Sequence, residues 1–270
     1  MLYRWKVRLL KRPRLNLLWR YWRTRQGEIT GSYDRLPEFI RNHVPGRSFA
    51  DIGCMWGVNG EYSFIAEAAG ATSVTAVDVF GPTPEFEEKR ITRGSRVRFV
   101  LGDATCASTL DEIGEADVVF CAGVLYHHPS PFDLLVALRR ICRETLILRT
   151  STIPEVRGLP NAAVYFPMLK PEARSLWNLK SLGLLHQAGI SNEFQRHEGY
   201  GNWFWGLTPS CLESLLETAG FHVDFRATEA FAQTVVCTAV APALEHRLPD
   251  HLQARELAAQ ISAAGIARPA

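Results

Sequence analysis

The stretch FADIGCMWGVNGEYSF, Phe49–Phe64, combines a short apolar strand, an acidic residue, a turn with spaced glycines and the start of a helix. Glycine turns of this kind usually surround a nucleotide, because the absence of a Cβ lets the backbone come close to a ligand. The glycines at positions 53, 57 and 60 do not have the G-x-G-x-x-G spacing of a dinucleotide-binding loop, and the sequence has no G-x-x-x-x-G-K-S/T phosphate loop. We therefore predict a nucleoside ligand without a pyrophosphate.

Strand-like and helix-like segments alternate around this loop. Apolar runs predict strands at residues 48–52, 72–78, 97–103, 116–122, 144–150, 221–227 and 233–241. Helical spacing predicts helices at residues 32–45, 61–70, 85–91, 130–141 and 208–220, with Ser130 and Thr208 as N-caps. Continuous apolar strands alternating with helices indicate a parallel sheet covered on both faces. One of the two closing strands must run antiparallel, because a tight connection cannot join parallel neighbours.

These patterns predict an α/β fold, a Rossmann-like doubly wound sheet of about seven strands with the last strand antiparallel. We divide the chain into a basic N-terminal helical arm (1–46), a ligand-binding domain (47–242) with an aromatic lid insertion (153–207), and an Ala-rich tail (243–270). Nine Lys and Arg residues and no acid precede Glu28, so the remaining chain carries 21 basic and 28 acidic residues. The arm either contacts phosphates or an anionic membrane surface, or packs on the domain as a solvated helix.

Three acidic residues lie at the carboxyl ends of three successive predicted strands: Asp51, Asp78 and Asp103. In open α/β sheets this edge holds the ligand. Asp51 is placed to face an ammonium group, Asp78 to accept from two ribose hydroxyls and Asp103 to accept from an adenine amino group. A cationic nucleoside such as S-adenosylmethionine fits this set, because it has no phosphate to repel the acids.

From Ser48 to Ala241 the chain resembles the class I S-adenosylmethionine-dependent methyltransferases. The resemblance rests on DIGCMWG as the cofactor loop, Asp78, the GDA motif and CAGVLYHHPSP after the fourth strand, although Met55 replaces the family's middle glycine. It implies that the cofactor is S-adenosyl-L-methionine. The implied cofactor-binding residues are Asp51, Gly53, Cys54, Gly57, Asp78, Val79, Asp103, Ala104 and Ala122.

Two adjacent histidines, His127 and His128, follow the fourth predicted strand. In the resemblance this segment faces the methyl group and the acceptor, so both are catalytic candidates; one acts as general base or merely braces the loop. A histidine base predicts a rate that rises with pH through an apparent pKa of roughly 6–7. No acidic cluster accompanies the pair, so we expect no metal site.

Aromatic and polar residues suited to a small acceptor are concentrated in the insertion and just before it. The expected substrate-binding residues are Tyr126, Tyr165, Tyr200, Asn202, Trp203 and Trp205. Such rings stack on sugars or planar ligands, although they could equally form a hydrophobic mini-core or a dimer contact.

The segments GVLYHHPSP and GNWFWGLTPSCLESLLETAGF are also similar to the tRNA wobble-uridine carboxymethyltransferases. Those enzymes use a carboxylated cofactor, and an arginine next to the asparagine of the second segment helps to bind the extra carboxylate. This chain has Gly201 before Asn202 instead. We therefore expect plain O-methyl transfer to a saccharide or other small metabolite, with a tRNA-modifying enzyme and a non-catalytic cofactor-binding protein as alternatives. Scattered cysteines, no apolar run of about 20 residues and no secretory layout predict a reduced, cytoplasmic protein without a transmembrane segment.

Overall fold

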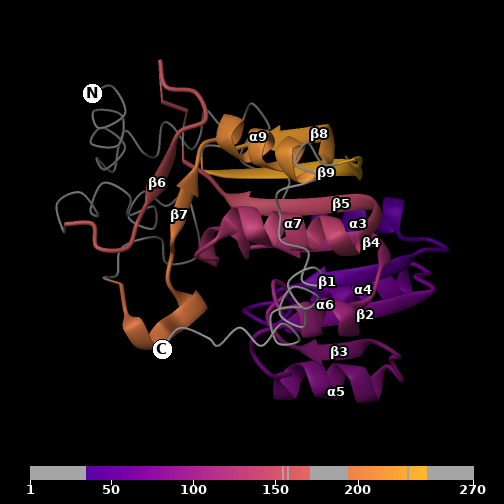
Figure 1. Ribbon diagram of the computed structural model, residues 1–270. Coiled ribbons are helices and arrows are strands. Elements are labelled where there is room, and N and C mark those ends of the chain that lie inside the picture. The colour runs from indigo at the N-terminus through magenta and orange to yellow at the C-terminus, as the bar shows by residue number, and fades with distance from the viewer. Residues whose placement is uncertain (1–34, 154, 157, 171–193, 230, 242–270) are drawn as a thin grey trace, which may run out of the picture.

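A seven-stranded sheet forms the centre of the computed structural model, which describes residues 35–153, 155–156, 158–170, 194–229 and 231–241. Its strand order is β3-β2-β1-β4-β5-β9-β8 (Figure 1). The strands are β1 (Ser48–Ile52), β2 (Ser73–Asp78), β3 (Arg98–Leu101), β4 (Ala116–Ala122), β5 (Cys142–Ser151), β8 (Phe221–Thr228) and β9 (Ala232–Ala239). The predicted doubly wound sheet is confirmed.

The last strand is the reversed one, as predicted. Strands β1 to β5 pair in parallel, whereas β9 pairs antiparallel with both β5 and β8. The chain reaches β9 from β8 across a short link, so β9 must turn back, and it fills the place between β5 and β8.

Helices cover both faces of the sheet. Helices α3 (Leu36–His43), α4 (Glu61–Ala68) and α5 (Pro84–Thr92) pack against one face, and α6 (Ala107–Ile113), α7 (Pro131–Ile141) and α9 (Pro209–Ala219) pack against the other. Neighbouring strand residues contribute to opposite cores: Phe49 to the first and Ala50 to the second. Two buried faces explain why the central strands are apolar throughout.

The helix ends test the predicted caps. Thr208 caps α9 by accepting a hydrogen bond from the amide of Cys211 at 3.3 Å, and Gly220 ends the helix in the left-handed conformation. Ser130 is the N-cap residue of α7, as predicted, but its hydroxyl donates to the Asp133 carboxylate and makes no capping hydrogen bond to a helix amide. Helix α6 was not predicted, because its seven residues are too few for a clear period.

The insertion lies at the carboxyl end of β5, to one side of the sheet (Figure 1). Its described part contains the antiparallel strands β6 (Ala163–Tyr165) and β7 (Trp205–Leu207) and the 3₁₀ segment η4 (Arg196–Gly201). Ile153 and Phe166 form a small separate core with Val164, Leu169 and Trp203 packed against it. Part of the aromatic content of the insertion therefore has a structural role.

The domain boundaries predicted at residues 46 and 242 stay predictions. Residues 1–34 of the arm and residues 243–270 of the tail lie outside the described residues. The described end of the arm, α3, buries Leu36, Phe39 and Ile40 in the core that α4 also joins. No helix in the described part of the chain combines the length and apolarity that crossing a membrane requires.

Candidate active site

The glycine loop after β1 is the tightest part of the site. Gly53 has a φ of 82°, and a Cβ added there would lie 2.2 Å from Cγ2 of Val124 in the loop after β4. The Gly53 amide donates to the carbonyl of Val77 at 2.8 Å, which fastens the loop to β2. Gly57 also has a positive φ, of 74°. Only glycine fits position 53 without displacing the loop after β4.

Asp78 joins the ends of β1 and β2. Its Oδ2 accepts a hydrogen bond from the amide of Met55 at 2.7 Å, and its Oδ1 accepts from the amide of Phe80 at 2.9 Å. Burial raises the pKa of this carboxyl, while hydrogen bonds from the amides of Phe80, Met55 and Val79 act in the opposite direction. Asp78 therefore shapes the glycine loop, and its carboxylate, with about four lone-pair sites, can still accept from a ligand hydroxyl.

Asp51 lies deeper than a ligand-contacting acid usually does. Its side chain is 1% exposed and accepts a hydrogen bond from the Ser63 hydroxyl of α4 at 2.6 Å. Burial, with a contribution from the nearby charge of Asp78, raises the pKa of Asp51 to about 7, while Ser63 opposes the shift. A cation arriving above the loop would favour the ionised form.

Asp103 connects the end of β3 with the insertion. Its Oδ1 accepts from the amide and hydroxyl of Thr105 at 2.8 and 2.7 Å, and its Oδ2 accepts a short hydrogen bond from the Tyr200 hydroxyl. Burial alone would raise the pKa of Asp103, but these hydrogen bonds outweigh it and hold the pKa below its usual value. Tyr200, predicted as an acceptor contact, is thus placed beside the predicted adenine-binding acid.

The other predicted cofactor residues lie along the same strand ends. They are Cys54 beside Gly53, Val79 after β2, Ala104 after β3 and Ala122 at the end of β4. Cys54 and Ala104 are buried, and Val79 is exposed. The topology therefore brings the whole predicted cofactor set to one edge of the sheet.

His127 is fixed by the insertion. Its Nδ1 lies 2.8 Å from the carbonyl oxygen of Asn202, an acceptor, so Nδ1 carries the proton and Nε2 keeps its lone pair. Burial lowers the pKa of His127 to about 4, partly offset by the Asn202 carbonyl. This value lies below the apparent pKa of roughly 6–7 expected for the rate of a histidine base, and that rate profile stays a prediction. The imidazole is neutral across the physiological range.

His128 occupies a different environment. Its Nδ1 lies 2.7 Å from the carbonyl oxygen of Ser130, and its Nε2 lies 3.9 Å from Oδ1 of Asp103. The side chain is 7% exposed, and the Tyr200 ring stacks on it with 5.5 Å between ring centroids. Both histidines therefore make the backbone-carbonyl contact expected of one of them. They differ in burial, because Nε2 of His128 is buried without a hydrogen-bond partner, whereas His127 Nε2 is not among the buried unpaired atoms of the described residues.

The predicted acceptor residues separate into groups. Tyr126 and Trp203 surround His127, with centroid distances of 4.1 and 5.9 Å, and they lie 4.3 Å from each other. The side chain of Asn202 holds the backbone of the insertion by donating to the carbonyls of Gln195 and Gly199.

Tyr165 and Trp205 form a pair of their own on β6 and β7, with 4.9 Å between their rings. Trp205 Nε1 donates to the carbonyl of Pro129 at 2.8 Å, which ties this pair to the loop after β4. Among the described residues, no group of three or more His, Cys, Asp and Glu side chains is arranged to hold a metal ion.

Trp56 is the site residue that the sequence did not single out as a contact. Its ring stacks on His127 with 5.8 Å between centroids and an interplanar angle of 13°. The only sequence signal was its place in the loop, next to Gly57.

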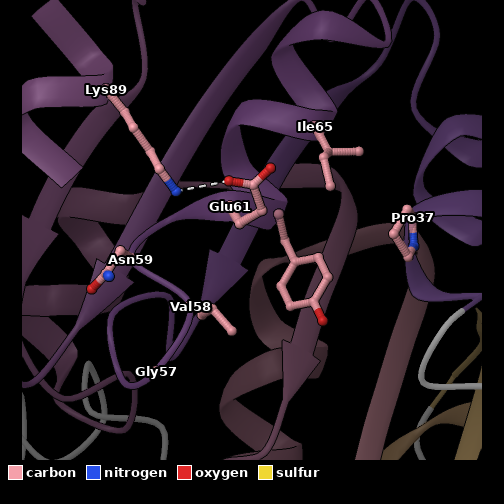
Figure 2. A pocket seen from close by; sticks show the side chains of 8 residues that line it. Pro37, Gly57, Val58, Asn59, Glu61, Ile65 and Lys89 are labelled. Atoms are coloured by element: carbon pink, nitrogen blue, oxygen red, sulfur yellow. Dashed lines mark hydrogen bonds and ion pairs between the residues drawn. The ribbon is translucent and has the colours of Figure 1, made fainter. Parts of the chain in front are cut away.

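A pocket of about 480 Å³ lies behind the glycine loop (Figure 2). It is lined by Pro37, Gly57, Val58, Asn59, Glu61, Tyr62, Ile65 and Lys89. Glu61 accepts an ion-paired hydrogen bond from Lys89 Nζ at 2.8 Å across this pocket. The loop is therefore bordered by open space on the side that faces α4 and α5.

Comparison with known proteins agrees with this site. Residues 49–145, which contain the glycine loop and all three acids, match the protein family described as "Methyltransferase domain". The matched domain is a class I S-adenosylmethionine-dependent methyltransferase domain. Its cofactor is S-adenosylmethionine.

Curated relatives of this methyltransferase include tRNA U34 carboxymethyltransferases. The enzyme of Shewanella piezotolerans is 33% identical over 171 residues, which are 53% of this chain and 47% of that protein. The enzyme of Methylococcus capsulatus is 29% identical over 179 residues, 58% of this chain and 52% of that protein. The chain spans about half the length of these relatives.

Solved structures share the fold. The N-terminal domain of EvdMO1, determined in the presence of S-adenosylhomocysteine and D-fucose, is 20% identical with a TM-score of 0.53, covering 77% of this chain and 82% of that chain. The 1,6-didemethyltoxoflavin N1-methyltransferase of Burkholderia thailandensis is 18% identical with a TM-score of 0.50, covering 76% and 77%. At such identities the likeness concerns the fold alone.

The residues of this methyltransferase fit its cofactor. Asp51, Asp78 and Asp103 provide carboxylates at the strand ends, and the backbone at Gly53 leaves no room for a Cβ. These groups suit an ammonium, ribose hydroxyls and an amino group, which are the donors of S-adenosylmethionine. When bound, the cofactor supplies an electrophilic methyl group on its sulfonium.

Proposed function

We propose that this methyltransferase transfers a methyl group to a hydroxyl of a saccharide or other small metabolite, with His127 as the general base. The observation that carries the proposal is the fixed orientation of the imidazole: its Nδ1–H is donated to the backbone carbonyl of Asn202, which leaves Nε2 as an acceptor. An aliphatic hydroxyl must lose its proton as the O–CH3 bond forms and the S–CH3 bond of the sulfonium breaks. His127 Nε2 would receive that proton, and S-adenosylhomocysteine would be the leaving group.

The surroundings of His127 support a ring-shaped or planar acceptor. Tyr126, Trp203 and Trp56 present aromatic faces or edges around the imidazole. Aromatic rings pack on the apolar faces of sugars and planar molecules, and they exclude water from a base. His128, which is held by Ser130 and neighbours Asp103, then has a bracing role at the cofactor end of the site.

The test combines acceptor discovery with a matched pair of variants. Purified protein and S-adenosylmethionine are added to a cell extract, and mass spectrometry identifies metabolites that gain one methyl group. On that acceptor, His127→Gln is expected to lower turnover by about 10²–10⁴-fold with unchanged cofactor affinity. His128→Gln is expected to weaken stability more than turnover. Near-complete turnover by His127→Gln would exclude this residue as the base and favour a nitrogen or phenolic acceptor.

A tRNA acceptor is the second candidate, favoured by the sequence similarity to tRNA U34 carboxymethyltransferases and by the basic arm. For this chain the plain methyl donor is the better proposal. A Cβ at Gly201 would already lie 3.2 Å from Trp56 Cη2, which leaves little room for a long side chain there. An arginine at that position, as in the carboxylate-binding relatives, would meet the indole.

Salt separates the two candidates. Binding to tRNA should weaken steeply between 50 and 200 mM salt, by roughly 10³-fold or more if six or more phosphates are contacted. Turnover of a small uncharged metabolite should change little over the same range. Methylation of bulk tRNA with a steep salt dependence, and no metabolite product, would replace the first proposal with the second.

A further inference from the structure

Trp56 touches three separate parts of the site. It stacks on His127, which follows β4, and meets Phe80, which follows β2, edge to face with centroids 5.6 Å apart and an interplanar angle of 81°. On the insertion, the backbone of Gly201 approaches so closely that an added Cβ would lie 3.2 Å from Trp56 Cη2. These contacts hold a side chain that is still 58% exposed.

The backbone on either side of Trp56 links it to the cofactor loop. The amide of the preceding residue, Met55, is donated to the Asp78 carboxylate, and the following residue, Gly57, has a φ of 74°. Gly57 also lines the pocket behind the loop (Figure 2). The backbone that carries Trp56 is thus held by Asp78 on one side and continues into a glycine turn that borders the pocket on the other.

We propose that Trp56 is a positioning residue that holds the ring of His127 in its working orientation and couples it to the cofactor loop. The inference rests on the proposed function of His127 as base. The Cβ–Cγ bond and the hydrogen bond from Nδ1 to Asn202 restrain the imidazole at two points, and the groups against the ring faces restrain its remaining tilt. Trp56 covers one face, and Tyr126 packs against the ring at a tilt of 39°.

Removing the indole should therefore release and hydrate the imidazole. Burial is the main cause of the low pKa of His127, and the Asn202 carbonyl opposes it. Without the indole, the pKa should move upward toward the ordinary histidine value of about 6.5, and both neutral tautomers should become populated. A residue that only stabilised the fold would leave the titration and tautomer of His127 unchanged.

Nitrogen-15 NMR of the histidine side chains measures this without an acceptor. Signals of His127 are assigned by their loss in His127→Gln, and each protein is titrated with and without S-adenosylhomocysteine. Trp56→Phe, which keeps a ring, should titrate as the wild type does. In Trp56→Leu, the pKa of His127 should be higher by roughly 1 or more, and His127 should populate both neutral tautomers. Tyr165→Leu removes another exposed ring that packs on an aromatic partner, so it is the matched control and should leave the pKa and tautomer of His127 unchanged.

Gly201→Ala tests the same contact from the insertion. The added Cβ would lie 3.2 Å from Trp56 Cη2, so it should shift the indole and alter the His127 signals. Alanine should not strain the backbone there, because Gly201 has no positive φ. Unchanged His127 titration in both Trp56→Leu and Gly201→Ala would overturn the proposal. A failure of the proposed function gives another result. In that case His127→Gln would retain turnover, and the NMR signals of His127 would still change in Trp56→Leu.

Discussion

Replacing Asp78 by alanine is expected to weaken both cofactor affinity and the fold, by amounts that the hydrogen bonds define. The carboxylate accepts from the amides of Met55 and Phe80. Met55 is 2% exposed, so its amide loses its partner without gaining water, whereas Phe80 is exposed and its amide can be hydrated. One orphaned buried amide costs about 1–3 kcal/mol of unfolding free energy.

Cofactor affinity should fall by a similar amount. Loss of the acceptor for ribose hydroxyls costs about 1–3 kcal/mol of binding free energy, which is roughly a 5- to 150-fold weaker affinity. Calorimetry with S-adenosylhomocysteine measures the affinity, and urea denaturation without ligand measures the stability. Unchanged affinity in a folded Asp78→Ala protein would remove Asp78 from the cofactor site.

Asp117→Ala is the matched control for this experiment. Asp117, in β4, accepts from the Ser48 amide at 2.8 Å and from the Ser48 hydroxyl at 2.7 Å at the start of β1, the opposite end of that strand from the glycine loop. Its loss should reduce stability by a comparable amount but leave the affinity for S-adenosylhomocysteine unchanged. An equal loss of affinity in both variants would mean that the effect of Asp78→Ala reflects general destabilisation.

Three further predictions concern the loop, the buried charges and the arm. Gly53→Ala should reduce the affinity for S-adenosylhomocysteine about tenfold or more, because its Cβ would clash with Val124. Gly81→Ala is the control: its Cβ would meet nothing within 4 Å, so the affinity measured by calorimetry should not change. The raised pKa of Asp51 (about 7) makes stability fall as pH rises from about 4 to 7, whereas the lowered pKa of His127 (about 4) makes stability rise with pH up to about 6.5. In urea denaturation across this pH range, the free energy of unfolding should rise with pH in Asp51→Asn and fall with pH in His127→Gln. Equal slopes in the two variants would contradict the pKa shifts of both residues. A chain that starts near Gly27 should bind S-adenosylhomocysteine with unchanged affinity by calorimetry, and a folded chain that fails to bind would place the arm in the cofactor pocket.

Local patterns were sufficient for most of the fold. Apolar runs located all seven strands of the large sheet, and the cap residues Thr208 and Gly220 located the ends of α9. The same kind of pattern located the start of α7 at the N-cap Ser130, but it did not show that the Ser130 hydroxyl donates to the Asp133 carboxylate. Strands β6 and β7 were missed, because three residues each are too short to show a period, and they pair only through tertiary packing.

The sequence by itself determined the Rossmann-like sheet with its reversed last strand. It also placed three carboxylates at one edge, because the carboxyl ends of parallel strands all lie at the same edge of the sheet. Only the tertiary structure decided the pKa, the tautomer and the hydrogen-bond partners of the groups at that edge. Asp51 and His127 owe their shifted pKa values to burial. The tautomer of His127 depends on a carbonyl 75 positions further along the chain, at Asn202. Hydrogen bonds and desolvation between residues so distant in sequence leave no local pattern, so the roles of His127, His128 and Trp56 follow from packing.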